Sequence, residues 1–148
     1  MTTGPASSRT RLQDRGNALA IILVVDEEQD SATLLKRVLE RDGHQVFTCS
    51  DHHDALARAS SLAPDLVVLE IRASRHESLT LAAPLKRSMR GVKVLAVTCC
   101  ASVETGEHAV ADDYLLRPVE LDTIEKKVRE LLAAKKQEEG SVALMPDS

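Results

Sequence analysis

The sequence contains very few aromatic residues, with one Phe, one Tyr and no Trp among its 148 residues. Proteins that bind single-stranded nucleic acid stack the bases on aromatic side chains, so this composition argues against that activity. Basic residues are not in excess either, because 19 Lys and Arg stand against 23 Asp and Glu and the net charge is −4. No cluster of Lys and Arg marks a surface for a phosphate backbone. We therefore expect no nucleic acid as a direct partner.

Cysteine is also scarce, and long apolar runs are absent. The spacing of Cys49, Cys99 and Cys100 matches neither a disulfide framework nor a zinc site, and small apolar fillers are the simpler interpretation. No apolar run approaches the length that crosses a membrane, and the N-terminal region lacks the apolar segment of a signal peptide. The sequence therefore predicts a cytoplasmic protein that does not associate with membranes.

The length of the chain suits one domain with a substantial core. Residues 1–18 are rich in Thr, Ser, Gly and Arg and have little to bury, so we predict a disordered leader there. Residues 19–138 carry the regular apolar pattern of a folded domain. Gly140 predicts the end of the last helix, and residues 139–148 are predicted to form a flexible tail.

Within the predicted domain, five strand-like apolar runs alternate with five helical patterns. The strands are expected at residues 20–25, 45–49, 65–70, 92–98 and 114–116. The helices are expected at residues 28–41, 51–62, 79–89, 102–110 and 121–139. Pro84 lies inside the third helical pattern, where it either kinks the helix or marks its true start. The alternation predicts an α/β fold, a flavodoxin-like (βα)5 doubly wound parallel sheet with strand order 2-1-3-4-5.

Two of the buried strands end in acidic residues. Asp26 and Glu27 follow the first strand, and Glu70 ends the third. The predicted strand order places these strands side by side, and ligands of such sheets bind at the carboxyl ends of the strands. We therefore expect three carboxylates to converge on one crevice. Burial alone would not select that arrangement, because like charges raise each other's pKa and cost stability.

The chain resembles the receiver domain of two-component response regulators over residues 19–135. The resemblance is carried by four motifs: Ile22-Leu23-Val24-Val25-Asp26-Glu27-Glu28, Pro64-Asp65-Leu66-Val67-Val68-Leu69-Glu70, Leu95-Ala96-Val97-Thr98, and Ala111-Asp112-Asp113-Tyr114-Leu115-Leu116-Arg117-Pro118. It implies a Mg²⁺-dependent phosphoacceptor aspartate at the third strand, an acid pair at the first, a hydroxyl at the fourth and a Lys-Pro pair at the fifth. It also implies a signalling surface made by the fourth helix, fifth strand and fifth helix.

Several positions keep the residue type that the resemblance implies. Asp26 and Glu27 fall on the acid pair, and Thr98 falls on the switch hydroxyl. Tyr114 falls on the aromatic switch position, and Pro118 falls on the proline, whose preceding peptide bond is cis in the family. We therefore predict a cis bond before Pro118, although cis is a minority state for bonds to proline.

Two positions that the resemblance assigns to the phosphorylation chemistry hold a different residue type. Glu70 stands at the phosphoacceptor position, and Arg117 stands at the lysine position. The extra methylene of glutamate advances the carboxylate by about 1.5 Å, and a misplacement of about 1 Å can cost on the order of 100-fold in rate. Phosphoryl transfer depends on positioning, so phosphorylation of Glu70 is expected to be very inefficient. The loop at residues 72–78 also lacks the family's Pro and Gly.

Two interpretations of this altered site remain open. Glu70 can imitate the phosphorylated state by engaging Arg117 or Thr98, since a guanidinium binds a carboxylate bidentately. Alternatively, Glu70 and Arg117 neutralise each other in an inert site. Asp26, Glu27 and Glu70 also form a candidate Mg²⁺ site, because Mg²⁺ needs few protein ligands. We expect no other cofactor.

The sequence therefore predicts an atypical single-domain receiver that is not an enzyme and binds another signalling protein without being phosphorylated. We expect the contact to use the fourth-helix, fifth-strand and fifth-helix surface, and the chain to be a monomer or weak homodimer. A Mg²⁺-dependent phosphorylatable receiver of a phosphorelay is the alternative. A flavin-binding enzyme is disfavoured, because acidic residues 26–28 stand where a flavin phosphate needs donors and no Gly-rich phosphate loop occurs.

The run from Asp51 to Asp54 contains two histidines between two aspartates, which suggests a second metal site. Asp51 also precedes a helical pattern, and Asp is a preferred residue at a helix N-cap. We favour the N-cap, with solvated histidines behind it.

Overall fold

The computed structural model describes residues 20–71, 81–98 and 111–144, with side chains up to residue 140. In these ranges five strands form one parallel sheet in the order β2-β1-β3-β4-β5, which confirms the predicted architecture. The strands are β1 (Ile21–Val25), β2 (Gln45–Cys49), β3 (Leu66–Ile71), β4 (Lys93–Thr98) and β5 (Asp113–Leu116). The predicted leader, the loop after β3 up to residue 80 and the helix predicted at residues 102–110 lie outside the described residues.

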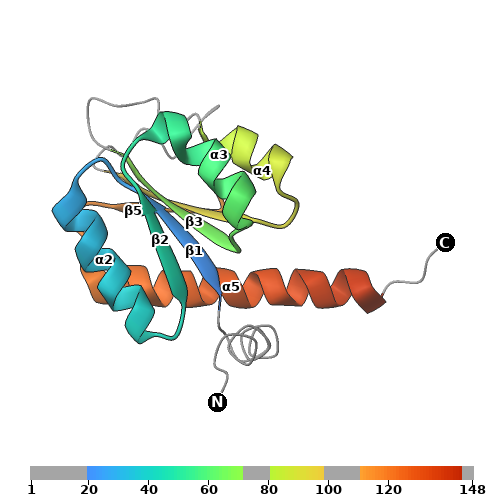
Figure 1. Ribbon diagram of the computed structural model, residues 1–148. Coiled ribbons are helices and arrows are strands. Elements are labelled where there is room, and N and C mark those ends of the chain that lie inside the picture. The colour runs from blue at the N-terminus through green and yellow to red at the C-terminus, as the bar shows by residue number, and fades with distance from the viewer. Residues whose placement is uncertain (1–19, 72–80, 99–110, 145–148) are drawn as a thin grey trace, which may run out of the picture.

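Helices cover both faces of the sheet (Figure 1). They are α2 (Gln29–Arg41), α3 (His52–Leu62), α4 (Ala82–Ser88) and α5 (Leu121–Leu144). Figure 1 places α3 and α4 on one face, and α2 and α5 on the other. Each face has its own apolar cluster, because alternate residues of a strand point to opposite faces. The label α4 denotes the helix that follows β3, which is the third helix of the predicted order.

The central strands are continuous apolar runs because the sheet is covered on both sides. All six residues of β3 and all six of β4 are buried. In the parallel register Leu69 of β3 lies opposite Val25 of β1, and Glu70 lies opposite Val97 of β4. The carboxyl ends of β1, β3 and β4 therefore meet at one edge of the sheet.

The start of α3 agrees with the N-cap interpretation. The Asp51 side chain accepts a hydrogen bond from the His53 backbone N–H at 2.9 Å, which satisfies one of the free donors of the first turn. The first helix also ends as predicted, because Gly43 adopts φ +96° directly after the Asp42 C-cap of α2.

Two other helix boundaries bear on predictions made from the sequence, at Pro84 and at Gly140. Pro84 is the third residue of α4, so among the described residues it lies in the first turn of that helix, as the second alternative expects. The predicted stop at Gly140 is wrong, because α5 continues to Leu144. A glycine ends a helix when it adopts positive φ, as Gly43 and Gly91 do, and Gly140 does not. Inside a helix glycine costs only about 1 kcal/mol relative to alanine, which the rest of α5 can tolerate.

Candidate functional site

Asp26 and Glu27 follow β1 but differ in their surroundings. Asp26 is 1% exposed, and its Oδ1 accepts a hydrogen bond from the Glu28 backbone N–H at 3.0 Å. Its own backbone N–H donates to the Cys49 carbonyl at 3.0 Å, which fixes the turn from β1 into α2. Glu27 is exposed. The acid pair therefore places one carboxylate inside the fold and the other toward solvent.

Glu70 is a buried carboxylate near the end of β3, with 4% of the residue exposed. Its Oε1 forms an ion pair and hydrogen bond with Nη2 of Arg117, which follows β5. The contact between these two side chains, expected from the sequence, is confirmed. The Arg117 side chain is 28% exposed, so the pair lies at the rim of the fold, with its acidic member inside and its basic member reaching solvent.

The backbone around Arg117 fixes where its guanidinium lies. The Arg117 N–H donates to the Thr98 carbonyl at 2.7 Å, which extends the β4–β5 ladder by one bond. The peptide bond between Arg117 and Pro118 is cis, as predicted. Nε of Arg117 is buried and has no hydrogen-bond partner among the described residues. Among the described residues, the contact recorded for this guanidinium is the one between Nη2 and Glu70.

Thr98 and Tyr114, the two predicted switch residues, lie in β4 and β5. Thr98 is fully buried as the last residue of β4, directly opposite Ile71 of β3. Tyr114 in β5 is partly buried and packs against the apolar cluster beneath α3 and α4. Its hydroxyl accepts a hydrogen bond from the Ala111 backbone N–H at 3.3 Å. The Tyr114 ring is therefore held against the core.

Asp26, Glu27 and Glu70 remain the candidate residues for a Mg²⁺ site. In the part of the chain that the structure describes, no group of three or more His, Cys, Asp or Glu side chains is arranged to hold a metal ion. Glu27 is exposed, and the Glu70 carboxylate contacts Arg117. The guanidinium therefore supplies positive charge at Glu70, as a bound cation would.

Asp112 has a role that sequence reasoning missed. Its Oδ2 accepts hydrogen bonds from the Val94 backbone N–H at 2.7 Å and from Lys86 Nζ at 2.6 Å. Lys93 Nζ lies 3.9 Å from Oδ1 and forms a 2.7 Å ion pair with Glu138 of α5. One carboxylate thus joins α4, β4 and β5 at the amino ends of the strands, opposite the end that carries Glu70.

Lys127 of α5 connects that helix to β5. Its ammonium lies 2.9 Å from Asp113 and 3.0 Å from Glu130. Hydrogen bonds to Asp113 and then to Glu130 raise the pKa of Lys127 above its usual 10.5. When the folded-state pKa of a lysine is raised, its ion pairs stabilise the fold in full at any pH below the ordinary pKa. This contribution is lost as the pH rises through the higher folded-state pKa.

We therefore expect Lys127→Met to lower the free energy of unfolding by about 0.2 to 1 kcal/mol at pH 7, the range of partly exposed ion pairs. The loss should be the same at pH 9 and should shrink above pH 10.5, where the wild-type ammonium begins to deprotonate. Urea unfolding of wild type and variant at these three pH values measures it. A loss that grows with pH would contradict the assigned ion pairs.

The sequence of the chain matches a known protein family over most of its length. A family model described as the response regulator receiver domain matches residues 22–129. The alkaline phosphatase synthesis transcriptional regulatory protein PhoP of Bacillus subtilis is 31% identical over 118 residues, covering 75% of this chain and 48% of PhoP. The transcriptional regulatory protein PrrA of Mycobacterium tuberculosis is 32% identical over 122 residues, covering 80% of this chain and 52% of PrrA.

Solved structures agree with this assignment. A CheY-like receiver domain protein from Methanospirillum hungatei superposes with a TM-score of 0.74 at 27% identity, covering 81% of this chain and 98% of that one. The response regulator TrrA of Thermotoga maritima, solved in complex with Mg²⁺-BeF, gives a TM-score of 0.69 at 27% identity, covering 76% and 99%. The chain spans about a quarter to about half of the length of the curated relatives it matches. None of the described helices is both long and apolar enough to cross a membrane.

Proposed function

The chain belongs to the response regulator receiver family, and on that premise we propose that it is a receiver whose acceptor site is held by an internal ion pair. It binds a signalling partner without being phosphorylated and catalyses no reaction of its own. The observation that carries the proposal is the contact between the buried Glu70 carboxylate and Arg117. We place this activity in the cytoplasm, as for a soluble signalling domain.

The ion pair opposes phosphorylation in two ways. Phosphoryl transfer depends on the position of the attacking carboxylate relative to the leaving group, and the guanidinium holds the Glu70 carboxylate through Oε1. A guanidinium is always charged and binds carboxylates in a fixed geometry, so it does not release Glu70 by deprotonation. Among the described residues there is also no group of metal-ligating side chains whose bound ion would compete with Arg117 for the Glu70 carboxylate. Together these features support a site that does not alternate between an unphosphorylated and a phosphorylated state.

The proposed partner surface includes β5 and α5. Leu116 at the end of β5 is 41% exposed, which makes it one of the two large apolar side chains exposed in the described part of the chain. Pro118 beside it is also exposed. Arg117, which pairs with Glu70, stands between these two residues in the sequence. A change of charge at residue 70 would thus act on the residue that separates Leu116 from Pro118.

We expect no phosphorylation of the wild-type protein by acetyl phosphate in the presence of Mg²⁺, because the acceptor oxygen is bound and misplaced. Intact-mass spectrometry measures the added phosphoryl group, and an ordinary receiver treated in parallel shows that the reagent is active. A phosphoryl mass mapped to Glu70 would favour a phosphorylatable receiver of a phosphorelay and overturn this proposal.

We expect Glu70→Gln to loosen the Arg117 contact, because the substitution keeps the shape and removes the charge. The effect should appear as changed amide chemical shifts at Thr98 and Tyr114, recorded on isotope-labelled protein. Asp30→Asn, which removes an exposed charge in the first turn of α2, is the matched control and should leave those two signals in place. Unchanged signals in Glu70→Gln would indicate an inert site.

A further inference from the structure

The outer side of α2 presents a large apolar side chain to solvent. Leu34 is 51% exposed, and Leu116 is the other large apolar residue exposed in the described part of the chain. A groove of about 600 Å³ lies around Leu34, and it is lined by Leu34, Arg37, Val38, Glu40 and Arg41. An exposed apolar side chain in a groove with a charged rim is typical of an interaction site.

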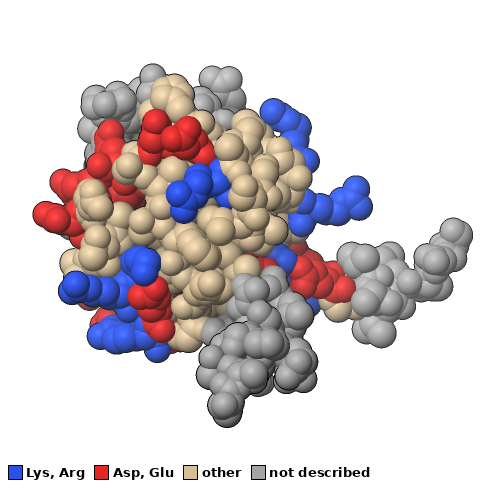
Figure 2. Space-filling model, in the orientation of Figure 1, with Lys and Arg blue, Asp and Glu red and all other residues tan. Residues whose placement is uncertain are grey.

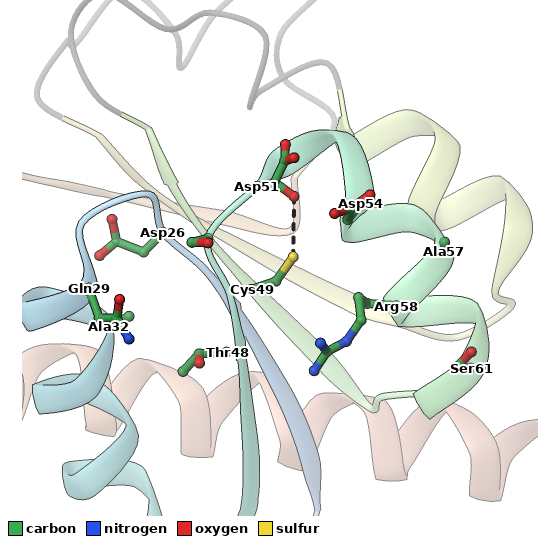
Figure 3. A pocket seen from close by; sticks show the side chains of 11 residues that line it. Asp26, Gln29, Ala32, Thr48, Cys49, Asp51, Asp54, Ala57, Arg58 and Ser61 are labelled. Carbon is green, nitrogen blue, oxygen red and sulfur yellow. Dashed lines mark hydrogen bonds between the residues drawn. The ribbon is translucent and has the colours of Figure 1, made fainter.

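The other sides of α2 face the fold. Ala32, Leu35 and Leu39 are buried in the apolar cluster that this helix shares with the sheet and α5. Gln29 and Ala32 line a separate groove that opens toward α3 (Figure 3). The face that contains Leu34 is therefore the one that α2 offers to another molecule.

This face is acidic before Leu34 and basic after it. Asp30 lies one turn before Leu34, and Arg37 and Arg41 lie about one and two turns after it. Residues three or four positions apart share a helix face, so all four belong to one stripe. Figure 2 shows acidic side chains gathered over the start of α2 and basic ones over its end. The stripe thus changes sign at its apolar centre.

The charges of the stripe are available for an external contact. Asp30, Arg37 and Arg41 are exposed, and their side chains form no hydrogen bond or ion pair within the described residues. Glu40 lies near the two arginines, but it pairs with Lys36 at 2.7 Å. The basic half therefore has an excess of positive charge that no described acid offsets.

A second copy of the same stripe has the complementary charges. If two α2 helices pack antiparallel about a two-fold axis at Leu34, the acidic half of each meets the basic half of the other. At about 1.5 Å per residue, Asp30 lies about 6 Å from the axis. Arg37 and Arg41 of the second copy lie about 4.5 and about 10.5 Å from it on the same side. A parallel arrangement would instead bring like charges together.

We propose that α2 is a contact between two copies of this chain, packed antiparallel with Leu34 at the two-fold axis. Asp30 of each copy pairs with Arg37 and Arg41 of the other. One helix face buries less than the roughly 1,200 Å² of a standard interface, so the dimer is weak, with Kd about 10 µM to 1 mM. α2 packs on β1 and β2, at the opposite edge of the sheet from β5, so the dimer depends on neither Glu70 nor the two switch residues.

The apolar centre is tested by ultracentrifugation of the full-length chain from about 10 µM to about 1 mM. We expect a monomer–dimer equilibrium, with amide signals of Leu34 and Arg37 that move as the concentration rises. Leu34→Asp should weaken the dimer at least tenfold, because two buried leucines are lost and two carboxylates meet at the axis. Leu116→Asp, the same change at the other exposed leucine, is the matched control and should dimerise as wild type does.

The charge pattern is tested by two variants that exchange its signs. Asp30→Lys makes the stripe wholly basic, and Arg37→Glu with Arg41→Glu makes it wholly acidic. Each variant alone should dimerise at least tenfold more weakly than wild type, because like charges then meet. An equimolar mixture should restore a one-to-one dimer, although both variants keep a negative net charge. Arg87→Glu with Arg90→Glu, at exposed arginines of α4 and the turn after it, should dimerise as wild type does.

Four results would overturn the proposal. A wild-type chain that stays monomeric at about 1 mM would show that this face does not bind a second copy. Dimerisation lost in Leu116→Asp and kept in Leu34→Asp would place the contact at β5. A mixture of the charge variants that stays monomeric would remove the role of the stripe. Signals of Leu34 that move only when a glutamate-rich helical peptide is added would identify an acidic helix of another protein as the occupant.

Discussion

Replacing Arg117 with alanine is expected to lower the free energy of unfolding by about 2 to 4 kcal/mol at pH 7. The Glu70 side chain is 2% exposed, so the variant would leave a carboxylate inside the fold without its recorded cationic partner. Removing one member of a fully buried pair costs about 3 to 5 kcal/mol. We place the expected value somewhat lower because the Arg117 side chain is 28% exposed and solvent can reach the vacated position. Urea unfolding followed by circular dichroism measures the difference.

The matched controls separate the charge from the packing. The double variant Glu70→Leu with Arg117→Met removes both charges and keeps similar volumes, so it should lie within about 1.5 kcal/mol of wild type. Arg90→Ala, at an exposed arginine, should change the stability by no more than about 0.5 kcal/mol. A loss in Arg117→Ala no larger than that of Arg90→Ala would show that the contact does not hold Glu70, and the proposed function would lose its basis.

The same ion pair explains why one conformation should dominate. A hydrogen bond to a charged group contributes about 1.5 to 3 kcal/mol, which biases a two-state equilibrium roughly ten- to a hundredfold. In a phosphorylated receiver that bias is added and removed with the phosphoryl group. Here the carboxylate is part of the side chain, so on the proposed function we expect the bias to be permanent.

The sequence predicted the fold because its signals were local and mutually consistent. β1, β3 and β4 are continuous apolar runs that only a sheet covered on both faces would bury. Right-handed crossovers then restrict the strand order to a few choices. The contact between Glu70 and Arg117 could also be predicted, since Glu70 lies near the carboxyl end of β3, Arg117 follows β5, and the carboxyl ends of parallel strands lie at the same end of the sheet.

The remaining features depend on tertiary neighbours that a sequence pattern does not carry. Asp26 and Glu27 are adjacent acids, yet only Asp26 is turned inward, because its carboxylate bonds the backbone of the turn into α2. Gly140 resembles a helix stop, but its backbone conformation decides whether it acts as one. The role of Asp112 depends on Lys86 and Val94, which are distant in the sequence and contact it only in the folded chain.

Asp112 gives the second large effect that we expect. Asp112→Ala removes the acceptor of the Val94 N–H, and an unsatisfied buried backbone donor costs about 1 to 3 kcal/mol. The same change removes the nearer partner of Lys86 and leaves Lys93, which is 7% exposed, with Glu138 alone. We therefore expect the free energy of unfolding to fall by about 2 to 3 kcal/mol, which urea unfolding at pH 7 measures.

Two further variants show which part of this carboxylate matters. Asp112→Asn keeps an oxygen for the Val94 N–H and loses the charge, so it should cost about half as much as Asp112→Ala. Glu139→Ala breaks an exposed pair with Lys135 one turn away on α5 and should cost about 0.5 kcal/mol or less. If Asp112→Ala cost no more than Glu139→Ala, the junction of α4, β4 and β5 would not depend on Asp112. A large loss confined to Asp112→Ala would instead show that the hydrogen bonds accepted by Oδ2 matter more than the charge, since the asparagine variant keeps an oxygen that can accept from Val94 and Lys86.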